Sequence, residues 1–132
     1  MARKAVTPPN NISIGPYSHA VEAGELLFLS GSTPFDPVTG HVAEGGVAAE
    51  AEQCFKNLFA VLEAAGLTPD DVVKVNVFLT NMSHFAAMNA VYSKQFNQPY
   101  PARTTVGVYS LPFGAQIEIE MVARRGPLKY RI

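Results

Sequence analysis

The sequence is short of cysteine, of long apolar runs and of charge, and each shortage excludes a class of protein. A single cysteine, Cys54, rules out a disulfide within the chain and favours the cytosol. No apolar run approaches the roughly 18 residues that a membrane-spanning helix requires. The residues after the basic start do not form the apolar core of a secretory signal. The sequence therefore predicts a cytoplasmic protein that does not enter a membrane.

Charged residues make up only 16% of the chain, against about 25% in an ordinary soluble domain. The hydrophobic fraction, 48%, is ordinary, so the unusual feature is the missing charge. A net charge of −1 disfavours binding to nucleic acid, which needs a basic surface. The shortage of charge predicts that part of the surface is covered by another subunit.

The common sequence signals of catalysis are also missing. The chain has no glycine-rich phosphate loop, no paired-histidine metal motif and no nucleophile elbow. Its three histidines, His19, His41 and His84, are far apart and are predicted to be solvated or capping residues. Cys54 lies on the apolar side of a predicted helix, which is typical of a buried, unreactive thiol.

What the sequence does contain is the pattern of one α+β domain spanning residues 1–132. Apolar residues at spacings of three and four predict two helices, and alternation predicts strands. The predicted elements are a hairpin (18–23 and 26–30), a helix (47–65) capped by Gly66, a strand (72–80), a helix (84–96) and two strands (103–109 and 116–123). This order predicts a mixed sheet with both helices on one face. The other face is then free to meet another subunit.

The two C-terminal strands are predicted to pair as a hairpin and to carry the candidate chemistry. Period-two alternation places Arg103 and Thr105 on one face, with Glu118 and Glu120 predicted to converge on them at the uncovered face. An arginine shielded from solvent binds the carboxylate of a ligand through two parallel hydrogen bonds. A glutamate beside that arginine can hold or activate a water molecule. The alternative is a structural Arg–Glu pair that closes a subunit interface, and the residue pattern leaves both open.

Several segments, taken in order, resemble the Rid family (YjgF-type reactive intermediate deaminases), and most closely its RidA branch. The resemblance covers about residues 5–125 and includes the C-terminal Pro101-Ala102-Arg103 and Ile117-Glu118-Ile119-Glu120. The other matching segments are residues 14–18, 28–31, 39–40, 63–67, 73–79, 85–92 and 111–112.

The resemblance implies a chorismate-mutase-like α+β fold and a homotrimer whose sheets form a central barrel, with three clefts between subunits. It also implies hydrolysis of reactive enamine and imine acids, of the 2-aminoacrylate and 2-iminobutanoate type, to 2-oxo acids and ammonia. Such acids are released by pyridoxal-phosphate enzymes. The resemblance implies that neither a metal nor an organic cofactor is needed.

The resemblance further assigns roles to particular residues. Arg103 corresponds to the arginine that binds the substrate carboxylate, and Glu118 corresponds to the acidic residue that positions the attacking water. Tyr17 and Ser30 correspond to residues that line the cleft, and Gly31 offers backbone contacts to the substrate. From the residue pattern alone, Tyr17 is a turn aromatic and Ser30 a hydroxyl at the end of a strand.

Two more positions are implied as substrate-binding. Asn89 matches an asparagine often found on the second helix. Thr105 stands where many members carry a cysteine, so thiol chemistry cannot operate there, although a hydroxyl can still form hydrogen bonds. Ser32 and Tyr109 also depart from the usual residues. These departures bear on the substrate range more than on the reaction type.

Three other functions remain open from the sequence. The same cleft could bind 2-oxo acids without turnover. A ribonuclease or translation-inhibitor role is disfavoured by the charge of −1 and by the lack of a basic stripe with interleaved aromatics. In a purely structural role, Arg103 and Glu118 would close the trimer.

Overall fold

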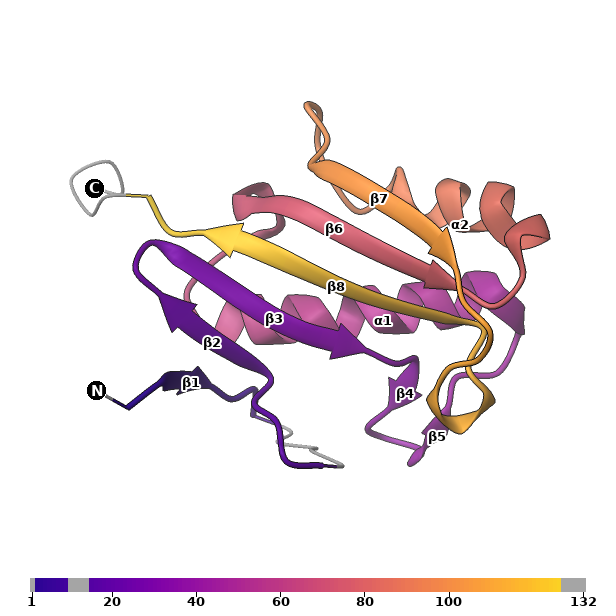
Figure 1. Cartoon of the computed structure of the whole chain (residues 1–132), viewed down its shortest axis with the longest axis horizontal. Coiled ribbons are helices and arrows are strands. Elements are labelled where there is room, and N and C mark those ends of the chain that lie inside the picture. Colours follow the sequence, from indigo (N-terminus) through magenta and orange to yellow (C-terminus); the bar gives the residue numbers. More distant parts are fainter. Residues whose placement is uncertain (1, 10–14, 127–132) are drawn as a thin grey trace.

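The fold is a mixed sheet with two helices on one of its faces (Figure 1). A computed structural model describes residues 2–9 and 15–126, so Ile14, the first residue of the matching segment 14–18, lies outside the described residues. The main sheet has the strand order β1-β2-β3-β8-β6-β7, and β4 and β5 form a separate pair. The strands are β1 (Lys4–Val6), β2 (Ala20–Ala23), β3 (Leu26–Ser32), β4 (Phe35–Asp36), β5 (His41–Val42), β6 (Val72–Leu79), β7 (Ala102–Gly107) and β8 (Ile117–Arg124). The predicted α+β class is confirmed.

Helix α1 (Gly46–Ala64) follows the predicted range of 47–65 within one residue. Its apolar side packs on the sheet, where Ala51, Cys54 and Leu62 are fully buried. The helix stops at Gly66, whose φ of +75° favours glycine, and the Leu67 N–H then bonds to the Leu62 carbonyl. Regular periodicity and a cap residue thus place this element from the sequence alone.

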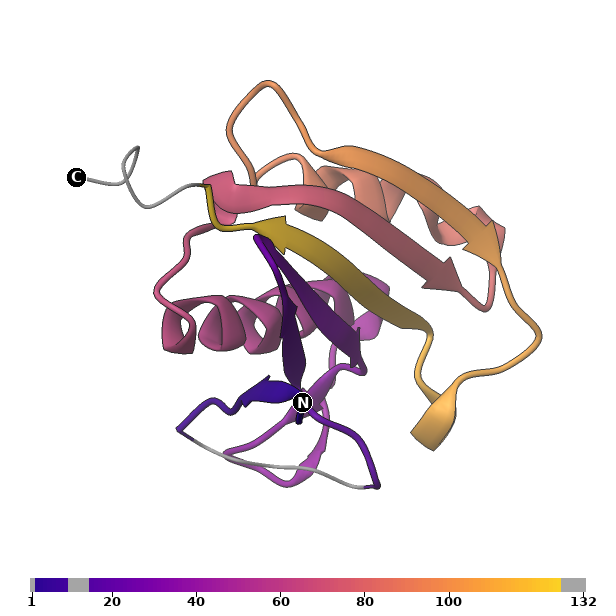
Figure 2. The ribbon, with the colours of Figure 1, turned by 60° about the vertical axis from the view of Figure 1, so that its left-hand side comes forward.

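Helix α2 (Phe85–Tyr92) is shorter than the predicted 84–96. It is preceded by the single turn η2 (Met82–His84), where the Asn81 side chain accepts a hydrogen bond from the Ser83 N–H. After Tyr92 the N–H groups of Lys94 and Gln95 bond to carbonyls three residues back, which makes tight turns. Both helices lie on the same side of the sheet (Figures 1 and 2). No described helix is long and apolar enough to cross a membrane.

The prediction that the C-terminal strands form a hairpin is wrong, because β6 lies between β7 and β8. β6 pairs in parallel with β7 and antiparallel with β8. The loop between β7 and β8 therefore crosses the end of β6. There Val108 N–H donates to the Leu79 carbonyl, and Thr80 N–H donates to the Gln116 carbonyl.

The prediction that Arg103 and Thr105 lie on the uncovered face is also wrong. Arg103 is in register with Val75, and Thr105 with Val77, and both valines are fully buried beneath the helices. Glu118 and Glu120 pair with Phe78 and Asn76 on the face without helices, as predicted. The alternation of apolar and polar residues along β7 did not identify which of its faces is covered, because both faces of the sheet are partly apolar.

The face without helices carries exposed hydrophobic side chains. Phe28 is 47% exposed and Val106 is 41% exposed, although each lies within a strand. Polar pairs share this face, since Lys74 Nζ donates to Thr104 Oγ1 at 2.9 Å and Asn76 Nδ2 donates to Glu120 Oε1 at 3.0 Å. Glu120 is therefore a bonded structural residue.

Candidate functional site

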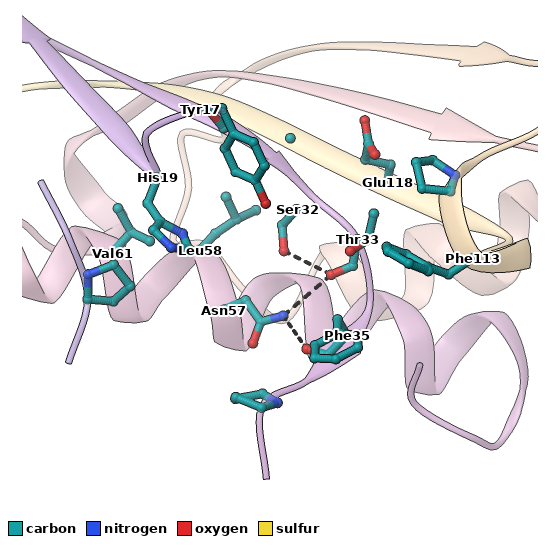
Figure 3. Close-up of a pocket in the computed structure, with 15 residues that line it drawn as sticks. Tyr17, His19, Ser32, Thr33, Phe35, Asn57, Leu58, Val61, Phe113 and Glu118 are labelled. Atoms are coloured by element: carbon teal, nitrogen blue, oxygen red, sulfur yellow. Dashed lines mark hydrogen bonds between the residues drawn. The ribbon is translucent and has the colours of Figure 1, made fainter. Parts of the chain in front are cut away.

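A cavity of about 300 Å³ lies between α1, the end of β3, the start of β8 and the turn η3 (Pro112–Gly114). It brings together four of the seven residues named from the sequence, Tyr17, Ser30, Gly31 and Glu118. The other described lining residues are Pro8, His19, Ser32, Thr33, Phe35, Pro37, Asn57, Leu58, Val61, Pro112 and Phe113 (Figure 3). Arg103, Thr105 and Asn89 do not line it.

Glu118 provides the acidic group of the cavity. None of the described residues donates a hydrogen bond to its half-buried carboxylate. Burial raises its pKa, and the negative charge of the neighbouring Glu120 raises it further. Gly31 lies directly against it, because a Cβ atom on Gly31 would lie only 2.7 Å from Glu118 Oε2. The carboxylate is therefore held beside the backbone of β3 with its oxygens available to a ligand.

The register of β3 against β8 shifts between Leu29 and Ser32, and this irregularity brings the backbone of Gly31 to the cavity. Ser30 Oγ donates to the Ser18 carbonyl at 2.6 Å, and the Ser30 N–H donates to the His19 carbonyl at 2.9 Å. These bonds tie the segment that carries Tyr17 to the end of β3.

His19 lies in the cavity rather than in solvent or at a cap, so the prediction for this histidine is wrong. Its ring meets the edge of the Tyr17 ring at a centroid distance of 6.2 Å. Its Nε2 is buried and has no partner among the described residues. The sequence contains a signal for this position, because residues two apart in an extended segment point the same way and His19 follows Tyr17 by two.

Helix α1 holds the backbone segment that lines one side of the cavity. The Cys54 thiol donates to the Ser32 carbonyl at 3.2 Å, and Asn57 Nδ2 donates to the Phe35 carbonyl at 2.8 Å. Burial raises the pKa of Cys54 well above its ordinary value, and the charges of Glu50 and Glu118 add to this effect. The predicted buried thiol is confirmed.

Glu50 links the helix to the strand that carries Glu118. It is buried, and its two carboxylate oxygens accept hydrogen bonds from the backbone N–H and the side-chain Nε2 of Gln116, each at 2.8 Å. Gln116 directly precedes β8 and follows the turn η3. The Glu50 carboxylate therefore holds both the backbone and the side chain of Gln116, between η3 and β8. Among the described residues, no group of three histidine, cysteine or acidic side chains forms a metal site.

Arg103 lies elsewhere, between β7 and α2. Its guanidinium packs over the rings of Tyr92, at 4.6 Å, and Phe85, at 5.5 Å, and contacts the Met88 sulfur at 3.8 Å. Burial raises the pKa of Tyr92, while the charge of Arg103 opposes this rise. Among the described residues no carboxylate forms an ion pair with Arg103, and the aromatic rings of Phe85 and Tyr92 hold its guanidinium.

Thr105 and Asn89 belong to the same region. Thr105 is two residues after Arg103 on the same face of β7, and its buried Oγ1 has no hydrogen-bond partner among the described residues. Asn89 follows Met88 on α2 and is half-buried. Arg103, Thr105 and Asn89, the second group of predicted site residues, therefore lie on β7 and α2 and outside the cavity.

The two groups are too far apart for one small ligand to touch both within one copy of the chain. β6 separates β7 from β8, a sideways distance of about 10 Å. Arg103 is level with Val75, which pairs with Met121, so Glu118 lies about 10 Å further along the strands. The two side chains also point to opposite faces of the sheet.

Residues 9–125 match the family described as Endoribonuclease L-PSP. The chain belongs to this family. It is 45% identical over 116 residues to the 2-iminobutanoate/2-iminopropanoate deaminase of Dermatophagoides farinae, a match that spans 88% of this chain and 91% of that protein. The Rid resemblance inferred from the sequence is confirmed.

Two solved structures have the same fold. RidA from the Antarctic bacterium Psychrobacter sp. PAMC 21119 matches with a TM-score of 0.85 and 42% identity, over 92% of this chain and 99% of that one. Escherichia coli TdcF with bound serine also matches with a TM-score of 0.85, at 35% identity, over 93% of this chain and 99% of that one.

Two aromatic residues of the cavity were not named from the sequence. Phe35 and Phe113 line the cavity and contact each other, with ring centroids 6.2 Å apart. Phe113 stands between Pro112 and Gly114, where a large aromatic residue is unusual for a turn. That local oddity is the signal that could have singled out Phe113, whereas nothing local indicates Phe35.

Proposed function

We propose that this protein hydrolyses reactive enamine and imine acids to 2-oxo acids and ammonia. The observation that carries the proposal is the unpartnered Glu118 carboxylate in a cavity that also holds Tyr17 and Ser30. The deaminase name of the relative from Dermatophagoides farinae supports the reaction class.

The reaction needs only water as co-substrate. An enamine acid first takes a proton on carbon and becomes the imine. Water then adds to the imine carbon while Glu118 accepts the proton that this water loses. The nitrogen gains a proton, the carbon–nitrogen bond breaks and ammonia leaves as the carbonyl forms. Glu118 suits this role because burial and the charge of Glu120 raise its pKa, which makes it a stronger base than an exposed carboxylate.

Arg103 binds the substrate carboxylate in this proposal, and it does so from a second copy of the chain. The distance between Arg103 and Glu118 within one copy supports a site shared by two copies. The exposed hydrophobic side chains of the face without helices support association through that face. The proposed assembly is a homotrimer with a site at each interface, in which Thr105 and Asn89 assist Arg103.

The remaining cavity residues orient the imine. Gly31 brings a stretch of backbone against Glu118, where N–H and carbonyl groups can contact a ligand. Tyr17 presents a hydroxyl group toward the cavity (Figure 3). Ser30 also lines the cavity. Imines hydrolyse readily, so positioning the water and polarising the imine are sufficient catalysis.

Binding without turnover is the second candidate, and the serine bound to TdcF favours it, because serine is a small carboxylate. The ribonuclease activity that the family description names finds less support. None of the described residues that line the cavity is a lysine or an arginine, the residues that bind RNA phosphates. Calorimetry with 2-oxo acids, beside the activity assay, separates binding from turnover.

The experiment generates an imine with an amino-acid dehydratase and measures how much escapes to semicarbazide, a trapping agent. The protein should lower trapping in proportion to its concentration, and equal trapping with and without it would refute the proposal. Mixing Arg103→Ala with Glu118→Gln tests the shared site. Reassembled trimers should regain activity at about a quarter of their sites. A site within one copy would regain none.

A further inference from the structure

The cavity beside Glu118 is larger than the smallest imine acids require. Its volume of about 300 Å³ corresponds to about ten water molecules at about 30 Å³ each. An imine acid such as 2-aminoacrylate fills much less, and its carboxylate belongs at Arg103, outside this cavity. The space beyond the polar groups is bounded by apolar side chains: Phe35, Pro37, Leu58, Val61, Pro112 and Phe113.

Phe113 is held in a conformation that a phenylalanine rarely adopts. Its φ is +62° and its ψ is 20°, Gly114 follows with a φ of +68°, and the Ala115 N–H donates to the Pro112 carbonyl at 3.1 Å. A turn with two such central residues normally has asparagine, aspartate or glycine first. A bulky aromatic residue there strains the backbone, and strain of this kind is concentrated at functional sites.

Core packing does not account for Phe113, because its side chain is 57% exposed. Its ring instead meets the Phe35 ring at the cavity, tilted by 47°. The backbone of Phe35 is fixed in turn by the bond from Asn57 to its carbonyl. Figure 3 shows the Phe113 ring between Glu118 and the Phe35 ring.

We infer that Phe35 and Phe113 form an aromatic wall that selects imine acids with a large apolar side chain, either branched aliphatic or aromatic. This inference rests on the proposed function and names the substrate class of the same site. The imine carbon lies at Glu118, and the side chain of the substrate extends along the wall. Burying that side chain against two rings favours large substrates over small ones.

The test compares imines of two sizes, made in place by an amino-acid oxidase from alanine and from leucine or phenylalanine, with semicarbazide as the trap. The parent protein should show a kcat/KM at least about tenfold higher for the large imines. Phe113→Gly removes the ring and relaxes the turn, so the preference should fall to about one while the thermal midpoint does not drop. Phe35→Ala should reduce the preference in the same direction.

Tyr109→Ala is the matched control. Although Tyr109 departs from the usual residue of the family, its aromatic side chain is fully exposed and does not line the cavity. It should leave the preference unchanged. Equal efficiency of the parent on both sizes would overturn the inference, and so would an equal loss on both sizes in Phe113→Gly.

If the parent clears no imine of any size, the proposed function fails and binding decides the inference. The ligands are then the matching 2-oxo acids, pyruvate and 4-methyl-2-oxopentanoate, measured by calorimetry. A preference for the larger acid that Phe113→Gly abolishes supports the wall. Equal binding of the two acids overturns it.

Discussion

Gly31 and Glu118 face each other so closely that a single methyl group on Gly31 would come within 2.7 Å of Glu118 Oε2. Gly31→Ala should therefore displace the carboxylate and lower imine clearance by about tenfold or more. The φ of Gly31 does not lie in the left-handed region, so alanine suits the backbone and the thermal midpoint should change little. Gly126→Ala is the control, because a Cβ there meets nothing within 4 Å. Full activity in Gly31→Ala would show that the position of Glu118 is unimportant.

The pH dependence of clearance should report the ionisation of Glu118. The ionised carboxylate accepts a proton, so the rate should fall as the pH drops through its raised pKa. Glu120→Gln removes the nearby negative charge and lowers the pKa of Glu118, so the acidic limb of the profile should move to lower pH. The glutamine oxygen can still accept the bond from Asn76. If the acidic limb of the pH profile were unchanged in Glu120→Gln, a group other than Glu118 would control the fall in clearance at low pH.

Glu118→Gln should separate activity from stability. A carboxyl whose pKa is raised by folding contributes stability below its unfolded pKa, and this contribution is lost as the pH rises through the folded pKa. Neutral glutamine avoids that loss, so the thermal midpoint at neutral pH should rise slightly while clearance falls. At a pH below both values, the midpoints of the variant and the parent should converge. A drop in the midpoint at neutral pH would contradict this account.

Arg103→Ala should lower clearance by about 100-fold, because the substrate carboxylate loses its fork. The fold should remain, at a stability cost of about 1 kcal/mol from the lost contacts with Phe85 and Tyr92. Arg103→Lys keeps the positive charge but cannot form two parallel hydrogen bonds to a carboxylate. Its rate of clearance should lie between those of the parent and of Arg103→Ala. Activity is read by semicarbazide trapping and stability by urea unfolding. Retained clearance in Arg103→Ala would remove Arg103 from the mechanism.

Glu50 should matter for stability. Glu50→Ala leaves the Gln116 N–H and Nε2 without their partners, at a cost of about 1–3 kcal/mol. Glu50→Gln keeps one acceptor and should cost less. Urea denaturation midpoints measure the difference. Glu63→Ala, on the exposed side of α1, is the control and should lie close to the parent.

The sequence predicted the elements whose pattern is local. Helix α1 ends where Gly66 permits a left-handed residue, and the β2–β3 hairpin forms around Gly24, so each is set by a few neighbouring residues. Strand order is different, because it depends on contacts between distant segments. Nothing near β7 or β8 indicates that β6 lies between them.

The faces of β7 show a second limit of pattern reading. Placing Arg103 and Thr105 on the uncovered face puts Val106 on the covered side, yet Val106 is 41% exposed. In a sheet whose second face is also apolar, hydrophobicity does not distinguish the two faces, and only the register with Val75 and Val77 does. For the cavity, the resemblance named Tyr17 and Glu118, but spacing along the chain did not predict their proximity.

Because Arg103 and Glu118 lie on opposite faces of the sheet, the proposed activity should depend on the concentration of the protein. A site completed by a second copy exists only while copies are associated, so specific activity should decline on dilution, unlike that of an enzyme with its whole site in one chain. A substitution such as Phe28→Ala, on the uncovered face and outside both groups, would then lower activity in dilute solution. Raising the protein concentration would restore it, and this recovery separates a weakened assembly from a damaged site.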